Sequence, residues 1–480
     1  MVASEAAPFA KVGGLGDFSA ALTRYLDLAG HDVRLFLPAH SSIDWAHHEL
    51  GQVEFLRDVP LELGGKSLRF KGLYSHLPGT SAQVYFIDCP DLYDRPGVYT
   101  DDPDEIVRFA LLSRAAIESC QRMGWSPHVF HCNDWHTSLL PVYLRSAYQW
   151  DELFALSRCL LTIHNIGYQG VFGAAALDEI GLGDRQSMFS RRDLEAGRIN
   201  LLKTGILHAD LVTTVSPTHA EEIRTPAYGM GLDGLLRQRA DRLVGILNGV
   251  DYAEWDPAHD ELLPYRYTEG NLSGKSRNKR SLLNEASLPL SPETPVIGMV
   301  TRLVEQKGIE LLPEVLPDVL DRRSCRLIVL GSGEERYEAF FFRLQEQYPD
   351  KVFFYRGYNN ELAHRIEAAS DIYLMPSLYE PCGLNQMYSL RYGAVPVVRR
   401  TGGLADAVQP FDAATREGTG FLFGPFKPAD LRGALEKALD TYARSRLWRR
   451  LIRNGMSQDF SWEKQVEKYV DLYRELSPTT

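Results

Sequence analysis

The sequence predicts two α/β domains, each built around a parallel sheet with helices on both faces. Short apolar runs alternate with helix-like segments along most of the chain, which is the pattern of repeated β-α-β units. The alternation relaxes over 248–292 and starts again at Pro295. A chain of 480 residues also exceeds the usual size of one domain. We therefore expect a first domain over 1–247, a second over 248–460 and a terminal helix within 461–480.

The expected strands are short, bounded apolar runs, and each is followed by a helical or glycine-rich segment. In the first domain they cover 32–37, 82–87, 128–132, 159–163 and 210–215. In the second they cover 295–300, 325–331, 351–355, 371–376 and 395–399. The first residues leave almost no room for a strand before the glycines that start at Gly13. Either the first strand is very short or the chain begins late.

Composition excludes several classes of protein. The formal net charge of −11 argues against a nucleic-acid binder, which needs a basic surface to neutralise phosphates. The six cysteines form no C-x-x-C pair, so we expect no zinc site and no disulfide framework. No apolar run reaches the length of a membrane span, and no signal peptide is recognisable. These observations predict a cytoplasmic protein that does not bind a membrane.

In open α/β sheets, ligands collect at the carboxyl ends of the strands. Arg302 and Lys307 follow the strand at 295–300, where two cations suit a diphosphate. Glu380 follows the strand at 371–376, and the next loop carries the backbone amides of Gly383, Leu384 and Asn385, with Gly383 expected to open a helix. The alternatives are a solvated charged loop for the two cations and a helix-terminal charge for Glu380.

The first domain offers a comparable set of side chains. His164 follows the strand at 159–163, and Asp134 follows the strand at 128–132. The alternatives are a structural histidine and an aspartate that caps the next helix. Lys11, Gly13 and Gly14 form a glycine-rich loop before a helical pattern, where the backbone could approach a ligand closely.

Taken together and in order, these segments resemble the starch and bacterial glycogen synthases. The matching strings include KVGGLGD, HCNDWHTSLLP, TIHNIGYQG, GILNGVDYAEWDP, TRLVEQKG, YEPCGLNQMYSLRYGAVPVVRRTGGLADAV and GTGFLF. They extend from about residue 3 to 423. The resemblance implies the GT-B architecture, in which two doubly wound Rossmann-like domains flank a deep cleft. It also implies that the terminal helix packs back on the first domain.

The resemblance assigns a role to each candidate. Lys11, with Gly13 and Gly14, is implied to approach the donor diphosphate and glucose, and Arg302 and Lys307 to be its main cations. Glu380 is implied to be the essential carboxylate beside the donor glucose, and the amides of Gly383, Leu384 and Asn385 to hold phosphate and sugar hydroxyls. His164, Asn165 and Asp134 are implied to face the glucose. Further substrate-side candidates are Asp17, Tyr99 and Asn248.

The implied activity is transfer of glucose from ADP-glucose to an α-1,4-glucan primer with retention of configuration. We expect no cofactor and no metal, because Lys11, Arg302 and Lys307 supply the cations. The string Asp102-Pro103-Asp104 precedes a helical pattern rather than following a buried strand. The preference between ADP-glucose and UDP-glucose and the oligomeric state stay open.

Two rival functions remain. One is a related sucrose- or trehalose-forming synthase, many of which carry a second glutamate eight residues after the first. Tyr388 stands at that place here, which favours a glucan synthase. The other is a catalytically inactive glucan-binding subunit, against which the complete set of candidate residues argues.

Overall fold

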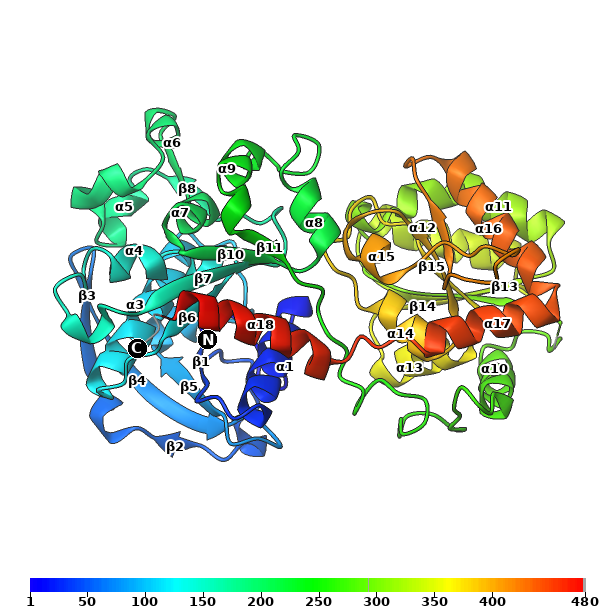
Figure 1. Ribbon diagram of the computed structural model, residues 1–480, viewed down its shortest axis with the longest axis horizontal. Helices are drawn as coiled ribbons and strands as arrows, with labels where there is room; N and C mark the ends of the chain where they lie inside the picture. The colour runs from blue at the N-terminus through cyan, green and yellow to red at the C-terminus, as the bar shows by residue number, and fades with distance from the viewer. Residues whose placement is uncertain (292, 478–480) are drawn as a thin grey trace. The chain divides into compact units, whose positions relative to one another are not determined.

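The computed structural model describes residues 1–291 and 293–477. The chain divides into two compact units, and Figure 1 follows it from one end to the other. The first unit contains Met1–Val215, Ala220–Ile246 and the C-terminal segment from Trp462. The second contains Ser216–His219 and Leu247–Ser461. None of the described helices is long and apolar enough to cross a membrane.

The first unit is built on a mixed sheet. One part has the order β1-β5-β4-β2, with β3 paired to β4. Its strands are β1 (Arg34–Pro38), β2 (Gly51–Gln52), β3 (Val59–Leu63), β4 (Lys66–His76) and β5 (Gln83–Asp88). The other part has the order β11-β10-β7-β6. Its strands are β6 (Val129–Asn133), β7 (Arg158–Ile163), β10 (Leu211–Thr214) and β11 (Leu243–Gly245).

Val2 joins the two parts of this sheet, because it forms parallel bridges both to Phe36 in β1 and to Cys132 in β6. The first residues thus occupy the place of the expected short strand. The pairings of β1 with β5 and of β6, β7, β10 and β11 are parallel, as expected. The edge formed by β2, β3 and β4 is antiparallel, which the sequence reading missed.

Helices of the first unit follow these strands. They are α1 (Gly14–Leu28), α2 (Pro90–Tyr93), α3 (Glu105–Arg122), α4 (Leu140–Leu144), α5 (Ala176–Glu179), α6 (Arg191–Glu195), α7 (Leu201–His208) and α9 (Asp233–Gln238). The helix α8 (Pro217–Glu222) has residues in both units. The small ribbon of β8 (Val171–Gly173) and β9 (Arg198–Asn200) lies outside the main sheet.

The last helix, α18 (Trp462–Leu476), packs on α1 within the first unit (Figure 1). Phe18 of α1 contacts the rings of Trp462 and Tyr469, with centroids 5.7 and 5.8 Å away. The hydroxyl of Tyr473 lies 2.7 Å from Nδ1 of His131 in β6. An apolar stripe at helical spacing therefore buries this helix against the first core.

The second unit has one parallel sheet in the order β14-β13-β12-β15-β16-β17. Its strands are β12 (Val296–Val300), β13 (Arg326–Gly331), β14 (Val352–Arg356), β15 (Ile372–Met375), β16 (Val395–Arg399) and β17 (Phe421–Phe423). Its helices are α10 (Ser273–Glu285), α11 (Leu312–Arg322), α12 (Glu335–Gln347), α13 (Asn360–Ala369), α14 (Asn385–Arg391), α15 (Gly402–Ala407), α16 (Pro428–Tyr442) and α17 (Ser445–Met456). The inner strands are buried on both faces, which explains why they appear as continuous apolar runs.

Candidate functional site

In the first unit, Asp134 directly follows β6 at its carboxyl end. Its backbone adopts φ 53° and ψ −169°, which is costly for a residue with a Cβ, and such strain concentrates at functional sites. Its Oδ1 accepts hydrogen bonds from the backbone N–H groups of His164 at 2.7 Å and Asn165 at 3.4 Å. The side chain forms no cap on the following helical turn, so the capping alternative is wrong. The predicted residues Asp134, His164 and Asn165 therefore lie together at the end of β6 and β7.

Burial dominates the electrostatics of Asp134. It raises the pKa of this carboxyl from 3.8 to about 7, because the two backbone donors only partly replace the lost water. The nearby carboxylate of Glu5 raises the pKa further. A carboxyl with a pKa near neutrality can accept or donate a proton, or bind a sugar hydroxyl, at physiological pH.

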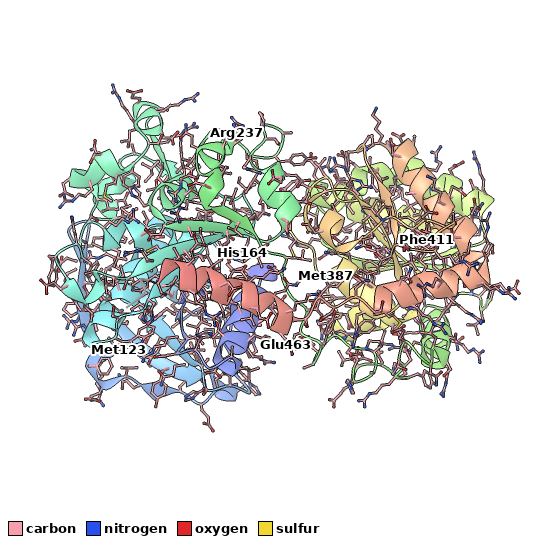
Figure 2. All side chains as sticks on the ribbon, viewed as in Figure 1. Met123, His164, Arg237, Met387, Phe411 and Glu463 are labelled. Atoms are coloured by element: carbon pink, nitrogen blue, oxygen red, sulfur yellow. The ribbon has the colours of Figure 1, made fainter. Side chains whose placement is uncertain are left out.

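His164 is held as a neutral imidazole. Its Nε2 lies 2.9 Å from Oδ1 of Asn133, whose own Nδ2 donates to the carbonyl of Val2 at 3.0 Å. Because a carbonyl oxygen can only accept, Nε2 of His164 carries the hydrogen and Nδ1 is left as an acceptor. Burial lowers the pKa of His164 to about 3. Its ring packs edge-on against Phe18 with centroids 4.5 Å apart, and Figure 2 labels its position.

The glycine-rich loop enters the same region from α1. Nζ of Lys11 forms an ion pair with Oδ1 of Asp17 at 2.7 Å, and both side chains are partly exposed. A Cβ added at Gly14 would meet no protein atom within 4 Å, so the fold itself does not require glycine there. The space beside Gly14 is consistent with the close approach of a ligand to this backbone.

Glu5 holds this loop in place, and the sequence reading missed it. Its buried carboxylate accepts from the backbone N–H groups of Val12 and Gly13, the latter at 3.1 Å. Its Oε1 accepts from the hydroxyl of Tyr99 at 2.9 Å. These loop amides, which we expected near a ligand, are therefore bound to Glu5. The sequence feature that could have revealed Glu5 is that it is the only charged residue in segment 1–10.

In the second unit, the half-buried Lys307 and the buried Glu380 form an ion pair at the carboxyl end of the sheet. Nζ of Lys307 lies 2.8 and 2.6 Å from the two carboxylate oxygens of Glu380. The hydroxyl of Ser377 donates to the same carboxylate at 3.0 Å. Only 6% of the Glu380 side chain is exposed. Glu380 is therefore a fixed, paired carboxylate and not a helix-terminal charge.

Two glycines allow this pair to form. Gly308, at φ 69°, brings the loop of Lys307 against the end of β15, where a Cβ would lie 2.1 Å from the carbonyl oxygen of Pro376. Gly402, at φ 40°, brings α15 against the Glu380 loop, where a Cβ would lie 2.0 Å from the carbonyl oxygen of Glu380. The turns TRLVEQKG and TGGLADAV thus fix the backbone of the two charged residues.

The loop after Glu380 differs from the expectation in one respect. The helix α14 begins at Asn385, so Gly383 does not open it, because Gly383 is left-handed at φ 70°. The backbone N–H groups of Gly383, Leu384 and Asn385 have no acceptor among the described residues. The side chain of Asn385 instead donates to the carbonyl of Val300 at 3.0 Å and to the hydroxyl of Tyr373 at 2.8 Å. It ties α14 to the end of β12.

Arg302 and Asn248 complete the candidates of the second unit. Arg302 follows β12 in an exposed turn and forms no ion pair with a described residue. Asn248 is buried, its backbone N–H donates to the sulfur of Cys382, and its Oδ1 has no partner in the described part of the chain. Burial raises the pKa of the Cys382 thiol to about 12, as expected for a packed cysteine.

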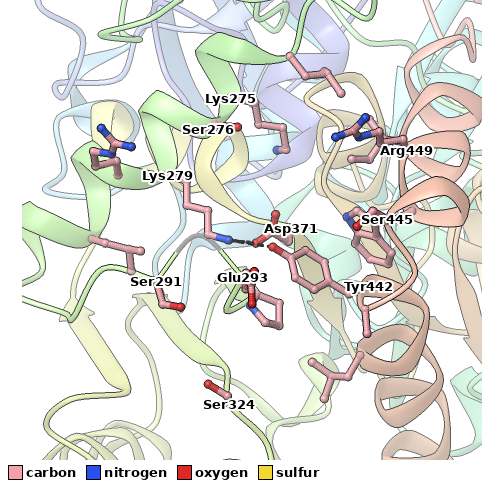
Figure 3. A pocket seen from close by; sticks show the side chains of 18 of the residues that line it. Lys275, Ser276, Lys279, Ser291, Glu293, Ser324, Asp371, Tyr442, Ser445 and Arg449 are labelled. Carbon is pink, nitrogen blue, oxygen red and sulfur yellow. Dashed lines mark hydrogen bonds and ion pairs between the residues drawn. The ribbon is translucent and has the colours of Figure 1, made fainter.

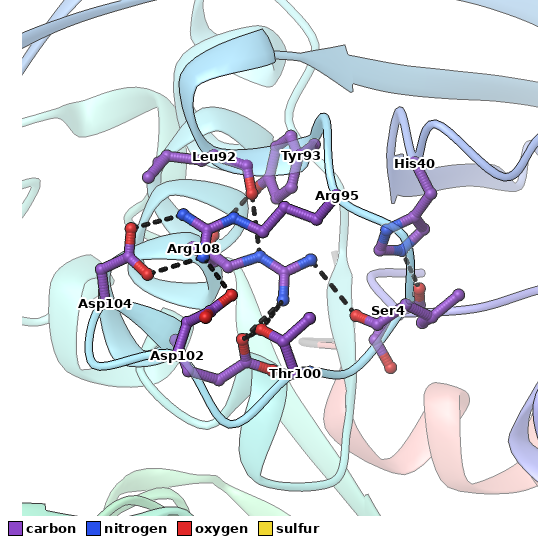
Figure 4. Close-up of polar contacts among 11 residues, drawn as sticks. Ser4, His40, Leu92, Tyr93, Arg95, Thr100, Asp102, Asp104 and Arg108 are labelled. Carbon is purple, nitrogen blue, oxygen red and sulfur yellow. Dashed lines mark hydrogen bonds and ion pairs between the residues drawn. The ribbon is translucent and has the colours of Figure 1, made fainter.

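The string Asp102-Pro103-Asp104 is bound to an arginine. The guanidinium of Arg95 contacts Oδ2 of Asp102 and Oδ2 of Asp104, both at 2.5 Å (Figure 4). Within residues 1–291 and 293–477, no group of three or more His, Cys, Asp or Glu side chains is placed to hold a metal ion.

We predict that Glu5 orders the glycine-rich loop. Glu5→Ala should speed hydrogen exchange at the amides of Val12 and Gly13 by about 10–100-fold, because each loses a bond to a buried carboxylate. Glu5→Gln keeps an acceptor oxygen and should exchange slowly. Mass-spectrometric exchange over residues 8–16 measures this, and slow exchange in Glu5→Ala would contradict the assignment.

Comparison with known proteins follows the same division of the chain. Residues 1–238 match the family model described as the starch synthase catalytic domain, and residues 283–458 match glycosyl transferases group 1. Glycogen synthase of Anaeromyxobacter dehalogenans strain 2CP-C is 45% identical over 486 residues, and the alignment covers 99% of this chain and 99% of that protein. Glycogen synthase of Thermotoga maritima is 42% identical, with coverage of 98% of this chain and 97% of its own.

Solved structures show the same relationship. The catalytic domain of starch synthase IV from Arabidopsis thaliana, bound to ADP and acarbose, is 34% identical with a TM-score of 0.91. It matches over 99% of this chain and 98% of its own. Sucrose-phosphate synthase from Thermosynechococcus elongatus, at 19% identity and a TM-score of 0.62, shares the fold. The expected GT-B fold class is confirmed, and the chain belongs to the family of glycogen and starch synthases, which are glycosyltransferases.

Proposed function

We propose that the protein transfers glucose from ADP-glucose to the non-reducing end of an α-1,4-glucan, with retention of configuration. The observation that carries the proposal is the paired, buried Glu380 at the carboxyl edge of the second sheet, where donor ligands of such folds bind. The likeness to a starch synthase that holds ADP supports an adenine nucleotide donor.

The second unit supplies what a departing diphosphate needs. Arg302 is an exposed cation beside the strand end, and the Lys307 ammonium has a third N–H besides the two that Glu380 accepts. The unpaired N–H groups of Gly383, Leu384 and Asn385 add preorganised donors. Such donors stabilise the negative charge that develops on the leaving group, which is commonly the largest catalytic contribution.

The proposed chemical step takes place on one face of the sugar. The acceptor hydroxyl forms its bond to C1 as the bond from C1 to the phosphate oxygen breaks, and the departing phosphate takes the hydroxyl proton. Glu380 is proposed to accept hydrogen bonds from glucose hydroxyls. In the first unit, Asp134, His164 and Asn165 are proposed to contact sugar hydroxyls, and Asp17 and Tyr99 to position substrate. In the second unit, Asn248 is also proposed to position substrate. Lys11 is proposed to bind donor phosphate, with Gly13 and Gly14 leaving room for it.

The sucrose-forming alternative is less well supported. The position eight residues after Glu380 is Tyr388, whose ring stacks on Trp255 with centroids 3.9 Å apart and planes at 1°. Trp255 also stacks on His364 at 3.7 Å. Tyr388 is thus part of an aromatic packing layer and does not supply a second carboxylate.

The direct test is glucan extension with radiolabelled ADP-glucose and UDP-glucose, with maltooligosaccharide, fructose and glucose 6-phosphate as separate acceptors. We expect incorporation into maltooligosaccharide, with a higher kcat/KM for ADP-glucose and newly formed α-1,4 linkages by NMR. Transfer to fructose or to the sugar phosphate would favour the rival synthases. Absence of any transfer would favour a glucan-binding subunit.

The Lys307–Glu380 pair gives a second prediction. Lys307→Met and Glu380→Gln should each lower kcat/KM about 30–1,000-fold, because each removes about 2–4 kcal/mol of transition-state stabilisation. Each single variant also leaves a buried partner unpaired, so the double variant should regain stability but not activity. Lys203→Met breaks a matched pair with Asp193 at 2.7 Å and serves as the control for stability alone. Wild-type kcat/KM in either single variant would contradict the roles of the pair.

We further propose that the reaction needs no metal, because Lys11, Arg302 and Lys307 are available as cations. Initial rates after chelation with EDTA should equal those with added Mg²⁺. A loss of activity that Mg²⁺ restores, together with a parallel loss in Asp102→Ala or Asp104→Ala, would overturn this proposal. If the aspartate variants lose activity but EDTA has no effect, the loss would be explained by the broken ion pairs with Arg95.

A further inference from the structure

The second unit has a basic pocket at the amino edge of its sheet, the edge opposite to Glu380. Its volume is about 1080 Å³, at the upper end of pockets that hold small ligands. Pro295 lies before β12, Ser324 lies before β13 and Asp371 lies before β15, and all three line it. The helices α10 and α17 also contribute to its lining (Figure 3). None of the candidate donor-site residues is part of this pocket.

The lining has a clear excess of positive charge. Five basic residues and two acidic ones face the pocket; the basic ones are Lys275, Lys279, Arg280, Arg323 and Arg449, and the acidic ones are Glu293 and Asp371. Nζ of Lys279 pairs with Asp371 at 2.7 Å, and Arg323 pairs with Glu436 and Asp440 outside the pocket. Lys275, Arg280 and Arg449 form no ion pair with any described residue. Three basic groups therefore remain without an acidic partner in the described part of the chain.

Lys275 is the unusual member of this group. It is buried, and its Nζ donates only to the carbonyls of Ala368 at 3.1 Å and Tyr392 at 2.9 Å. Burial lowers the pKa of Lys275 to about 8, because the charges of Asp371 and Glu367 offset only part of the lost hydration. An anion in the pocket would offset more of it.

The two helices that face each other across the pocket, α10 and α17, are both rich in basic residues. The sequence contains no acid between 271 and 284 or between 441 and 458. In α17, Arg446, Arg449, Arg450 and Arg453 lie three to four residues apart, so they share one exposed face. The whole chain carries a net charge of −11, so this local excess is not a consequence of composition. The basic segment at 271–280 also has no part in the proposed transfer reaction.

We propose that this pocket binds a small phosphorylated, hydroxyl-bearing molecule of the size of a sugar phosphate. Exposed guanidinium groups such as those of Arg280 and Arg449 can each bind a phosphoryl group in a bidentate manner. The hydroxyls of Ser276, Ser445 and Tyr442 line the same space and suit a polyhydroxylated body. A small ligand is favoured over a nucleic acid because the cations line a concave pocket and the net charge of the chain repels a polyanion.

Equilibrium binding at constant ionic strength tests the proposal. The probes are fructose 6-phosphate, fructose and inorganic phosphate, measured by calorimetry on the full chain. Every protein in the experiment also carries Arg302→Gln, which removes phosphate binding at the candidate donor site from the measured signal. We expect fructose 6-phosphate to bind and fructose not to bind. Arg280→Gln and Arg449→Gln should each weaken binding about tenfold, because each removes one charge-assisted contact.

Arg343→Gln is the matched control, because Arg343 is an exposed arginine of the same unit that lies outside the pocket. It should bind fructose 6-phosphate as tightly as the parent, and thermal unfolding should show all variants to be folded. Undiminished binding in the Arg280→Gln, Arg449→Gln double variant would overturn the proposal. Equal affinity for inorganic phosphate would overturn the assignment of a sugar body. A different result would be that the parent protein binds heparin but not fructose 6-phosphate, and that the Arg446→Gln, Arg450→Gln double variant loses the binding of heparin. This result would indicate a polyanion surface instead.

Discussion

Buried carboxylates at the ends of strands are the constraint on which both candidate sites depend. An ionised carboxylate out of water must find donors, and each one here finds them in a different way. Glu380 accepts hydrogen bonds from the ammonium of Lys307. Asp134 accepts them from the backbone amides of His164 and Asn165, and Glu5 accepts them from the backbone amides of the glycine-rich loop. Each solution fixes a loop that would otherwise be free to move. The geometry of the two sites is thus a consequence of satisfying these three groups.

The parallel sheet of the second unit gives its two edges different chemistry. At the carboxyl edge, the chain places glycine turns and an acid, Glu380, whose charge is balanced by Lys307. At the amino edge, the basic residues of α10 and α17 outnumber the two acids of the pocket lining, Glu293 and Asp371, and Asp371 is already paired with Lys279. Asp371 directly precedes β15, and the Glu380 loop follows the strand after Met375. The two edges are therefore connected by a strand that is buried except at Met375.

Much of the fold could be predicted because its signals are local. All ten expected strands are present, since buried parallel strands appear as continuous apolar runs. The antiparallel edge was missed although Gly64 and Gly65 separate two alternating segments, which is a hairpin signal. Glu5 and the start of α14 could not be placed, because each depends on partners far away in the sequence. Val2 pairs with Phe36 and Cys132, and Glu5 with Tyr99.

The protonation of the first site follows from burial and is the reverse of the usual order for these side chains. The pKa of Asp134 lies at about 7, whereas that of His164 lies at about 3. Near neutral pH the imidazole is therefore uncharged, and Asp134 is the group that exchanges a proton. Because burial raises the pKa of Asp134 in the folded state, its contribution to stability is complete below 3.8 and is lost as pH rises through about 7. Ionised Asp134 therefore makes the folded first unit less stable than protonated Asp134 does. Because an ionised carboxylate accepts a hydrogen bond more strongly, the sugar contact proposed for Asp134 would be strongest in the protonation state that least favours the fold of the first unit.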